Sequence, residues 1–268
     1  MSSIGKRITQ LVANTLISVA VVAVLWFLAL WAFNVQPFIG KNPFDVYAFL
    51  FEVPAASENR ELVAKALGQT LIDSSIGFAV GMFLATLVAL IFSLSKGVEQ
   101  ALMPLAMLLR SVPLIAMAPI IILIFGREQL SVAVMGAIVV LFPALVNIVF
   151  GLRSAPPAMF DLVAVYGGNK LDALRAVAFP SSLPSFFAAL KISVPGAITG
   201  ALLVEWLATG QGIGYAIVSA IGRARPSEVW TYVALITVVS IVLYNIVAML
   251  EESVLAKYGH TTVKQPNK

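Results

Sequence analysis

The chain has 268 residues, of which 60% are apolar and only 11% are charged, and its formal net charge is +4. Soluble globular domains carry about a quarter charged residues, so this composition excludes an ordinary soluble domain and indicates a membrane protein. Cysteine is absent, and the single histidine, His260, lies in the polar C-terminal tail. Disulfides, thiolate metal sites and histidine catalysis within the membrane are therefore excluded, and without a basic cluster no nucleic-acid binding is expected.

Six apolar runs are long enough to cross a bilayer. An α-helix rises about 1.5 Å per residue, so about 20 apolar residues span a hydrocarbon core of roughly 30 Å. The first run follows Lys6 and Arg7 and is too long for a cleaved signal peptide, so we interpret it as a retained signal anchor. The sequence predicts one all-α transmembrane domain over residues 1–268, with spans at 11–33, 68–94, 102–125, 131–150, 183–208 and 229–250.

The segments between the spans set the expected orientation. Two short interfacial helices are expected at Asp45–Phe51 and Asn59–Leu67, and the glycine-rich stretch 210–214 predicts a tight turn and re-entry at the outer surface. With the N-terminus inside, nine Lys and Arg residues lie on the inner side and six on the outer side, which favours cytoplasmic termini. The inner residues are Lys6, Arg7, Lys96, Arg153, Lys170, Arg175, Lys257, Lys264 and Lys268, and the outer ones are Lys41, Arg60, Lys65, Arg127, Arg223 and Arg225.

The most informative loop lies between the fourth and fifth spans, at residues 156–182. It keeps a helical pattern on both sides of Gly167-Gly168 and predicts two short helices, Asp161–Tyr166 and Asn169–Ala178. Glycine adopts positive φ at little cost, so the glycine pair suits a sharp turn between them. A cytoplasmic loop of this length favours a docking surface, and an ordinary amphipathic loop helix is the alternative.

Four ionisable residues fall inside the predicted spans, where charge is costly and usually functional: Asp73, Arg110, Lys191 and Glu205. Lys191 lies near the cytoplasmic end, and snorkelling to the headgroups is its favoured interpretation. Arg110 is deeper, and its guanidinium can meet an anionic solute in a bidentate contact or hold a carboxylate of a neighbouring helix. Asp73 and Glu205 lie nearer the outer surface.

Prolines and glycines are concentrated in the same spans. Pro113 and Pro119 remove backbone hydrogen bonds and predict a kink in the third span, which either lines a pathway or serves packing. The pairs Gly77-x-x-x-Gly81 and Gly196-x-x-x-Gly200 have the spacing that lets membrane helices approach closely. Close packing is the favoured interpretation of these glycines, and gating is the alternative.

The loop at residues 156–182 resembles the cytoplasmic coupling loop of bacterial ABC importer permeases. Asp161-Leu162-Val163 stands at the place of the acidic-Ala-Ala start, Gly167 is the motif glycine, and Phe179-Pro180 stands at the Leu-Pro pair. Further segments between residues 68 and 232 resemble the nitrate/sulfonate/taurine (NitT/TauT) permease family. They are Leu108–Pro113 with Ala118-Pro119 and Phe125-Gly126, Phe142-Pro143, Asn147–Gly151, and Glu205 with Gly210–Tyr215.

This resemblance implies a type I ABC importer permease (MetI-like) fold and a non-catalytic subunit in the bacterial cytoplasmic (inner) membrane. The implied partners are two cytoplasmic ABC ATPases carrying ATP and Mg²⁺, a second permease chain, an extracytoplasmic solute-binding protein and membrane lipid. The second permease is expected to be another copy of this chain, with a related chain as the alternative. No cofactor or metal is expected here, because the sequence has no G-x-x-x-x-G-K-[ST] phosphate loop.

The resemblance and the intramembrane charges together assign roles to particular residues. The expected ATPase-coupling residues are Asp161, Val163, Tyr166, Gly167, Gly168, Lys170, Asp172, Arg175 and Pro180. The expected residues of the translocation pathway or its gate are Asp73, Arg110, Pro113, Pro119 and Glu205.

The solute implied by the resemblance is small and anionic, such as a sulfonate, taurine or nitrate. Asp73 departs from the family pattern, in which a basic residue is usual, so a vitamin precursor such as a thiamine pyrimidine is the alternative. An ion-coupled secondary transporter is a further alternative, but no internal repeat or midplane carboxylate supports it. An intramembrane enzyme would need a clustered nucleophile and base or metal ligands, which the sequence lacks.

Overall fold

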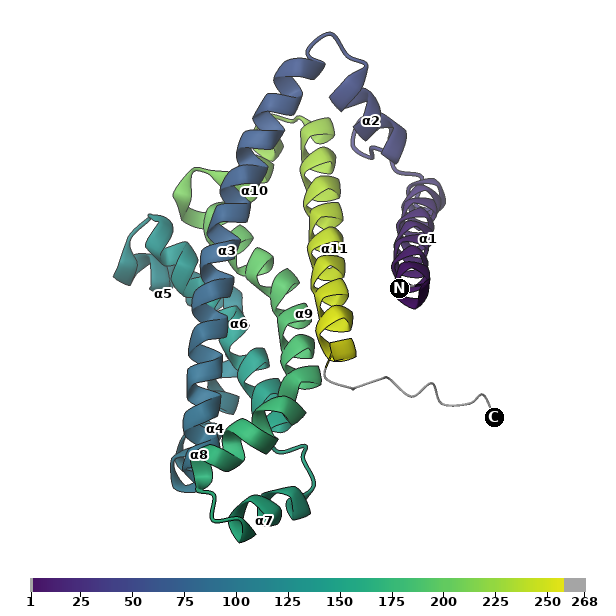
Figure 1. Cartoon of the computed structure of the whole chain (residues 1–268). Coiled ribbons are helices and arrows are strands. Elements are labelled where there is room, and N and C mark those ends of the chain that lie inside the picture. The colour runs from purple at the N-terminus through teal and green to yellow at the C-terminus, as the bar shows by residue number, and fades with distance from the viewer. Residues whose placement is uncertain (1, 258–268) are drawn as a thin grey trace.

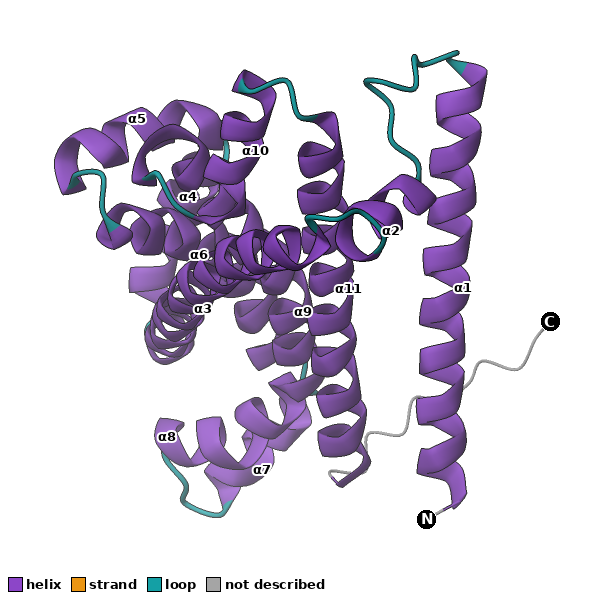
Figure 2. Cartoon of the chain, turned by 90° about the horizontal axis from the view of Figure 1, so that it is seen from above, coloured by secondary structure: helices purple, strands orange, loops and turns teal. Residues whose placement is uncertain are grey.

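The structure, a computed structural model, describes residues 2–257, with side chains at residue 13 and residues 15–257. The side chains of Lys6 and Arg7, and the tail residues His260, Lys264 and Lys268, lie outside these ranges. Within residues 2–257 the regular structure is helical throughout (Figure 2), which confirms the all-α prediction. The elements are α1 (Ser2–Ala32), α2 (Pro43–Phe51), α3 (Ala56–Leu94), α4 (Lys96–Arg110), α5 (Leu114–Phe125), α6 (Gln129–Leu152), α7 (Pro157–Val165), α8 (Lys170–Ala173), the π-helical turn η1 (Leu174–Ala178), α9 (Phe179–Val204), the π-helical turn η2 (Glu205–Thr209), α10 (Gly212–Gly222) and α11 (Pro226–Lys257).

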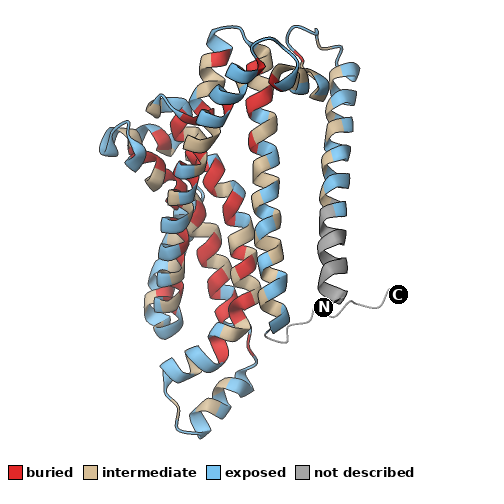
Figure 3. Cartoon of the chain, turned by 45° about the horizontal axis from the view of Figure 1, so that its top comes forward, coloured by how far each residue is buried: buried red, intermediate tan, exposed pale blue. Residues whose placement is uncertain are grey.

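Helices α3, α6 and α9 form the packed centre of the molecule, where most of the buried residues lie (Figure 3). Gly77 of α3 meets Gly136 of α6 backbone to backbone, since a Cβ added at Gly77 would lie 2.8 Å from the Gly136 Cα atom. A Cβ at Gly200 of α9 would lie 2.9 Å from the same Cα atom. Small residues allow such close helix approach in a membrane, so packing accounts for Gly77 and Gly200.

Helix α11 packs against α9 and α10, and α1 stands on the far side of α11 (Figure 1). The indole rings of Trp26 and Trp230 stack with 5.2 Å between their centroids, and Trp230 Nε1 donates a hydrogen bond to the carbonyl of Ile39 at 2.8 Å. Most large apolar side chains of α1 within residues 15–32 are exposed, and Trp31 is 76% exposed. An apolar surface of this extent requires lipid or a protein partner.

Five of the described helices are long and apolar enough to cross a membrane, and α4 with α5 provides a sixth candidate. The predicted third span, 102–125, is not a single helix, because α4 and α5 are bent by 101° at Ser111–Pro113. Pro113 has no N–H to donate and disfavours helical backbone at Val112. Ser111 Oγ donates to the carbonyl of Leu108 at 2.7 Å and closes the end of α4. The sequence predicted a kink here, and the structure has a broken helix pair.

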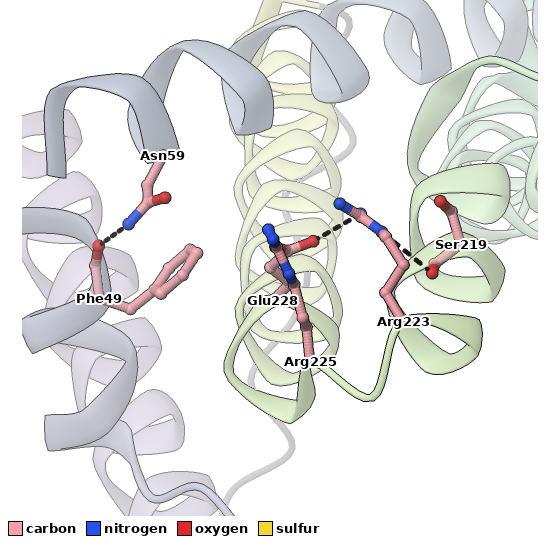
Figure 4. Close-up of polar contacts among 6 residues, drawn as sticks. All are labelled: Phe49, Asn59, Ser219, Arg223, Arg225 and Glu228. Atoms are coloured by element: carbon pink, nitrogen blue, oxygen red, sulfur yellow. Dashed lines mark hydrogen bonds and ion pairs between the residues drawn. The ribbon is translucent and has the colours of Figure 1, made fainter. Parts of the chain in front are cut away.

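The expectation of a separate short helix at Asn59–Leu67 was wrong. Helix α3 runs without a break from Ala56 to Leu94, because no proline interrupts it and isolated glycines such as Gly68 are tolerated inside a helix. Its 39 residues extend about 58 Å at about 1.5 Å each, nearly twice a hydrocarbon core of roughly 30 Å. In its first turns, Asn59 Nδ2 donates to the carbonyl of Phe49 in α2 at 2.8 Å (Figure 4).

Candidate functional site

A helical hairpin, α7 and α8 at residues 157–173, projects from one end of the molecule (Figure 1). Gly167 has φ +80° and reverses the chain after α7. The N–H of Gly168 donates to the carbonyl of Val163 at 2.9 Å, and the N–H of Gly167 donates to that of Ala164 at 3.0 Å. These two bonds form a Schellman motif, in which a left-handed glycine ends a helix by satisfying its last carbonyls.

Asn169 begins the second arm of the hairpin. Its Oδ1 accepts from the N–H groups of Leu171 at 2.8 Å and Asp172 at 3.1 Å, while Asp172 Oδ2 accepts from the N–H of Asn169 at 2.8 Å. This reciprocal pair is a capping box, which fixes where a helix starts. The sequence therefore encodes helix, turn and helix in the α7–α8 hairpin through its own short-range hydrogen bonds.

The bounds of the hairpin differ from the prediction at both ends. Helix α7 begins at Pro157, four residues before Asp161, because proline suits the first turn of a helix. The second predicted helix does not end at Ala178, and α8 continues through η1 into α9. Pro180 consequently lies in the first turn of α9 instead of in a loop, and the wide π-helical turn before it leaves room for its ring.

The α7–α8 hairpin exposes several large apolar side chains. Val165 is 83% exposed and Tyr166 is 84% exposed, and further apolar side chains beside them are exposed at Met159, Leu162 and Leu171. An apolar patch at the tip of a projecting hairpin marks a protein-binding surface. Sequence analysis singled out Tyr166 but missed Met159, Leu162 and Val165, although their spacing of three residues places them on one face of a helix.

The expected coupling residues are largely brought together in this hairpin. Asp161, Lys170 and Asp172 are exposed on it, and Arg175 is exposed in η1, directly after it. Val163 is half-buried, since its side chain lies against the backbone of the Gly167-Gly168 turn and a Cβ at Gly168 would meet the Val163 Cγ1 atom at 2.5 Å. Val163 and Gly168 therefore shape the turn of the hairpin.

An ion pair that sequence analysis missed ties the base of the hairpin to the helix bundle. Arg153, which follows α6, pairs with the buried carboxylate of Glu99 in α4. Ser154 Oγ donates to the carbonyl of Ser181 in α9 at 3.1 Å. These contacts join the ends of α4, α6 and α9 at the place where the hairpin leaves the bundle.

A second polar cluster lies at the opposite end of the bundle, around the fully buried Glu205. Its Oε2 accepts from Thr70 Oγ1 at 2.9 Å and from the N–H of Gly214 at 2.8 Å. Thr70 Oγ1 in turn accepts from the N–H of Ile213 at 2.8 Å. Gly212 has φ +82°, and a Cβ there would collide with the Glu205 carboxyl group. Glu205 therefore fastens the start of α10 to α3 and α9.

Replacing Glu205 with alanine should destabilise this corner. Thr70 and Gly214 would each keep a buried donor without its acceptor, and unsatisfied buried groups cost about 1–3 kcal/mol each, so we expect the free energy of unfolding to fall by about 2–4 kcal/mol. Glu205→Gln keeps an acceptor oxygen and is the matched control, with a loss below about 1.5 kcal/mol. Thermal unfolding in detergent, followed by circular dichroism, measures both. Equal stability of the two variants would contradict the role of Glu205 as a hydrogen-bond acceptor.

Asp73 lies near this cluster, on the same helix as Thr70. It is buried, and its Oδ1 accepts from Gln69 Nε2 at 3.0 Å and from Gln129 Nε2 at 3.2 Å. The structure thus brings Asp73 and Glu205 to one end of the bundle, as the sequence predicted. Arg110 ends α4, and Pro113 and Pro119 belong to the break and to α5, so these three expected pathway residues form a separate group.

Arg110 is exposed at the broken α4–α5 corner. Within the part of the chain that the structure describes, no carboxylate pairs with its guanidinium. An isolated charge inside a membrane costs at least about 2.5 kcal/mol, so Arg110 requires a partner outside the described chain or a wet pathway. The interpretation that Arg110 braces a neighbouring helix of the same chain therefore finds no acceptor.

We expect Arg110→Ala to lower solute uptake at least tenfold and Arg110→Lys to retain an intermediate rate. Lysine keeps the charge but loses the planar array of donors. The measurement is uptake per assembled complex, with assembly quantified by native mass spectrometry. Parallel losses of uptake and assembly in both variants would show a structural role instead, and full uptake by the alanine variant would leave Arg110 without either role.

Lys191 has a partner that the sequence did not indicate. Its Nζ lies 2.5 Å from Glu251 Oε2 of α11, and both side chains are mostly buried. The sequence favoured a Lys191 side chain that snorkels to the headgroups. In the structure it instead forms an ion pair that links α9 to α11. The two residues are 60 positions apart, so no local pattern could reveal the pairing.

Two arginines share one carboxylate at the turn between α10 and α11 (Figure 4). Glu228 accepts from Arg223 Nη2 and from Arg225 Nη1, each at 2.8 Å, and Arg223 Nε also donates to the carbonyl of Ser219 at 3.2 Å. The hydrogen bond and charge of Glu228 raise the pKa of Arg225. The exposed guanidinium groups form a fixed cationic surface beside the start of α3.

An all-helical chain with several spans and a projecting apolar hairpin defines a membrane-embedded subunit of a larger assembly. The chain belongs to the family of binding-protein-dependent transport system inner membrane components, whose model matches residues 77–256. It is therefore a non-catalytic, multi-pass permease of ABC transporters in the inner membrane, and the resemblance to NitT/TauT permeases is confirmed. Permeases of this family act with an ATPase and a binding protein.

Individual relatives cover most of the chain. A probable ABC transporter permease protein of Haemophilus influenzae is 28% identical over 85% of this chain and 91% of its own length. The formylaminopyrimidine transport permease protein ThiX of Halalkalibacterium halodurans is 32% identical over 67% of this chain and 70% of its own length. A putative aliphatic sulfonates transport permease protein, SsuC of Escherichia coli, is 26% identical over 94% of this chain and 91% of its own length.

A solved structure shares the fold. The crystal structure of an amino acid ABC transporter with histidines matches with a TM-score of 0.57 at 15% sequence identity, over 74% of this chain and 97% of that chain. This structural likeness confirms the predicted permease fold. At 15% sequence identity it is evidence for the fold and not for the solute.

Proposed function

We propose that two copies of this chain form the transmembrane pathway of an ATP-driven importer, with an ATPase bound to each copy and a binding protein delivering the solute outside. Both termini and the α7–α8 hairpin face the cytoplasm in this proposal. The excess of Lys and Arg on that side supports it. So does the direction of the described ends of α1 and α11, which point toward the end that carries α7 (Figure 1).

The observation that carries the proposal is the uncovered apolar surface of the α7–α8 hairpin. Its short-range hydrogen bonds hold it in shape without a partner, and Val165 and Tyr166 are its most exposed large hydrophobic side chains. A hairpin that is rigid and apolar fits a groove on a soluble protein, because a preformed surface loses little conformational entropy on binding. The Glu99–Arg153 ion pair then connects that surface to α4 and α6.

The test is the composition of the complex. The chain is expressed with a partner ABC ATPase, purified in mild detergent, and weighed by native mass spectrometry. We expect two copies of each chain. Tyr166→Asp should strip the ATPase from the complex, because it places a charge in the apolar contact. The matched control is Tyr47→Asp, at an exposed site on α2 outside the spans, which should retain the ATPase.

Two results would overturn parts of this proposal. If the purified chain never retains an ATPase, the proposed importer function is refuted and an ion-coupled transporter is favoured. One copy of this chain in a complex with two ATPases would exclude the homodimer and indicate a related permease as the second chain.

The finer question is the solute. The family resemblance implied a small anion, such as a sulfonate, taurine or nitrate, and a thiamine pyrimidine was the alternative. Two of the three relatives reported above divide in the same way, since one is named for a formylaminopyrimidine and one for aliphatic sulfonates.

A further inference from the structure

A polar cavity of about 520 Å³ lies where α3 ends and α4 begins, against α8 and η1, at the end of the molecule that carries the hairpin (Figure 1). The polar side chains that line it are those of two lysines and two serines, Lys96, Lys170, Ser93 and Ser95. The rest of the lining is apolar and consists of Leu94, Phe160, Ala173, Leu174 and Ala178. The cavity thus joins a cationic wall to an apolar one.

The charges at this cavity favour an anion. No carboxylate is part of its lining, and within residues 15–257 no ion pair neutralises Lys96 or Lys170. Lys96 also lines a larger neighbouring cavity, to which Glu99 and Asp161 contribute carboxylates. Glu99 is already paired with Arg153, so only Asp161 opposes the two lysines there. The lining of the two cavities together therefore keeps an excess of positive charge.

The start of α4 adds uncharged hydrogen-bond donors to the same wall. Ser95 is the N-cap residue of α4, yet its side chain makes no capping hydrogen bond. Its hydroxyl group is therefore available to a ligand, and the first N–H groups of α4 have no acceptor within their own helix. Together with the two ammonium groups, these donors suit the oxygen atoms of an oxyanion.

An exposed apolar stripe on α3 leads to this cavity. Val80, Leu84, Leu87, Ile91 and Leu94 follow one another at steps of three or four residues, so they lie on one face of the helix. Each is at least 36% exposed, and Leu94 both ends the stripe and lines the cavity. The stripe fits acyl chains and the cavity fits a headgroup, whereas a free anion or an acidic loop of a protein would use the cavity alone.

We infer that this cavity binds the headgroup of an anionic phospholipid, with Lys96 and Lys170 at its phosphodiester group and the acyl chains along the stripe on α3. Basic pockets between membrane helices are known sites for anionic headgroups. The inference goes beyond the proposed function, since it concerns neither the solute nor ATP hydrolysis. Because Lys96 belongs to α4 and Lys170 to α8, one bound headgroup would hold the hairpin against the bundle.

Native mass spectrometry of the purified full-length protein in detergent micelles counts bound lipids directly. The probes are phosphatidylglycerol, phosphatidylcholine with the same acyl chains, and inorganic phosphate. We expect phosphatidylglycerol to bind at least tenfold more tightly than phosphatidylcholine, because the choline ammonium group is repelled by the two lysines. Inorganic phosphate should not displace the lipid, because it makes no contact with the apolar stripe.

The double variant Lys96→Gln with Lys170→Gln should weaken phosphatidylglycerol binding at least tenfold, because each lysine beside an anionic headgroup raises the affinity several-fold. The matched control is Lys65→Gln with Lys257→Gln, which removes the same charge from exposed sites outside the cavity. We expect this control to bind phosphatidylglycerol within about twofold of the wild type.

Four outcomes overturn the inference: equal binding of the two lipids, unchanged phosphatidylglycerol binding in the Lys96 and Lys170 variant, an equal loss in the control, or displacement of the lipid by inorganic phosphate. Release of the lipid when a partner ABC ATPase assembles with the chain would also overturn it and assign the cavity to a protein interface. Failure of ATP-driven uptake with intact, lysine-dependent lipid binding would instead count against the proposed importer function alone.

Discussion

Gly167→Val is expected to abolish ATP-driven uptake while leaving the membrane helices folded. Gly167 has φ +80°, and a Cβ there would meet nothing within 4 Å, so the substitution acts on the backbone alone. A β-branched residue held in this region costs about 1–3 kcal/mol, and the hairpin can escape that cost by opening its turn. The Schellman bonds of Gly167 and Gly168 would then be lost, and the apolar surface would change shape.

The control for this prediction is Gly97→Val. Gly97 is an exposed glycine in α4, near the same end of the molecule, with ordinary helical backbone and open space around it. We expect uptake within about twofold of the wild type for this control. The measurement is ATP-driven uptake in proteoliposomes, with helix content followed by circular dichroism. Normal uptake by the Gly167→Val protein would refute the coupling role of the hairpin.

Gly136→Leu should have the largest effect on folding. A Cβ at Gly136 would lie 3.0 Å from the Gly77 Cα atom, and Gly200 approaches Gly136 from the other side. The Gly77 atoms are backbone and cannot rotate away, so α3 and α6 would have to separate. Overpacking a core costs about 1–3 kcal/mol and at times more, and with two backbones in contact we expect the upper end of this range, about 3 kcal/mol or more.

Gly222→Leu is the matched control for Gly136→Leu, because a Cβ at Gly222 meets nothing within 4 Å. The readout is the yield of monodisperse protein and its thermal unfolding temperature in detergent. We expect the Gly136→Leu protein to aggregate, or to have an unfolding temperature well below that of the wild type. The Gly222→Leu control should unfold at the same temperature as the wild type. A folded, stable Gly136→Leu protein would show that these three helices are not in backbone contact.

Local signals in the sequence predicted the helices and the hairpin but not their meeting points. Asn169 and Asp172 are three residues apart, so their capping box could be inferred from composition and spacing. The glycine pair 77 and 81 likewise indicated close packing. Its partner on α6, Gly136, was missed, because a single glycine carries no spacing signal and the contact joins residues far apart in the chain.

The polar clusters were predictable only as isolated charges. Glu205 and Asp73 stood out because charge is costly in a span, but the bond between Glu205 and Thr70 joins residues 135 positions apart. Proline chemistry predicted a bend after Arg110, while the 101° angle depends on how α5 packs against α6 and α9. The same limit applies to Lys191 and Glu251, which meet only because α9 and α11 lie side by side.

Uptake into proteoliposomes tests the central claim most directly. The vesicles hold this chain and its ATPase with ATP inside, the binding protein is added outside, and labelled aminopyrimidine, sulfonate and nitrate are offered in turn. We predict that one solute accumulates above its outside concentration only when hydrolysable ATP is present. Accumulation that needs an ion gradient and no ATP would contradict the account and identify a secondary transporter.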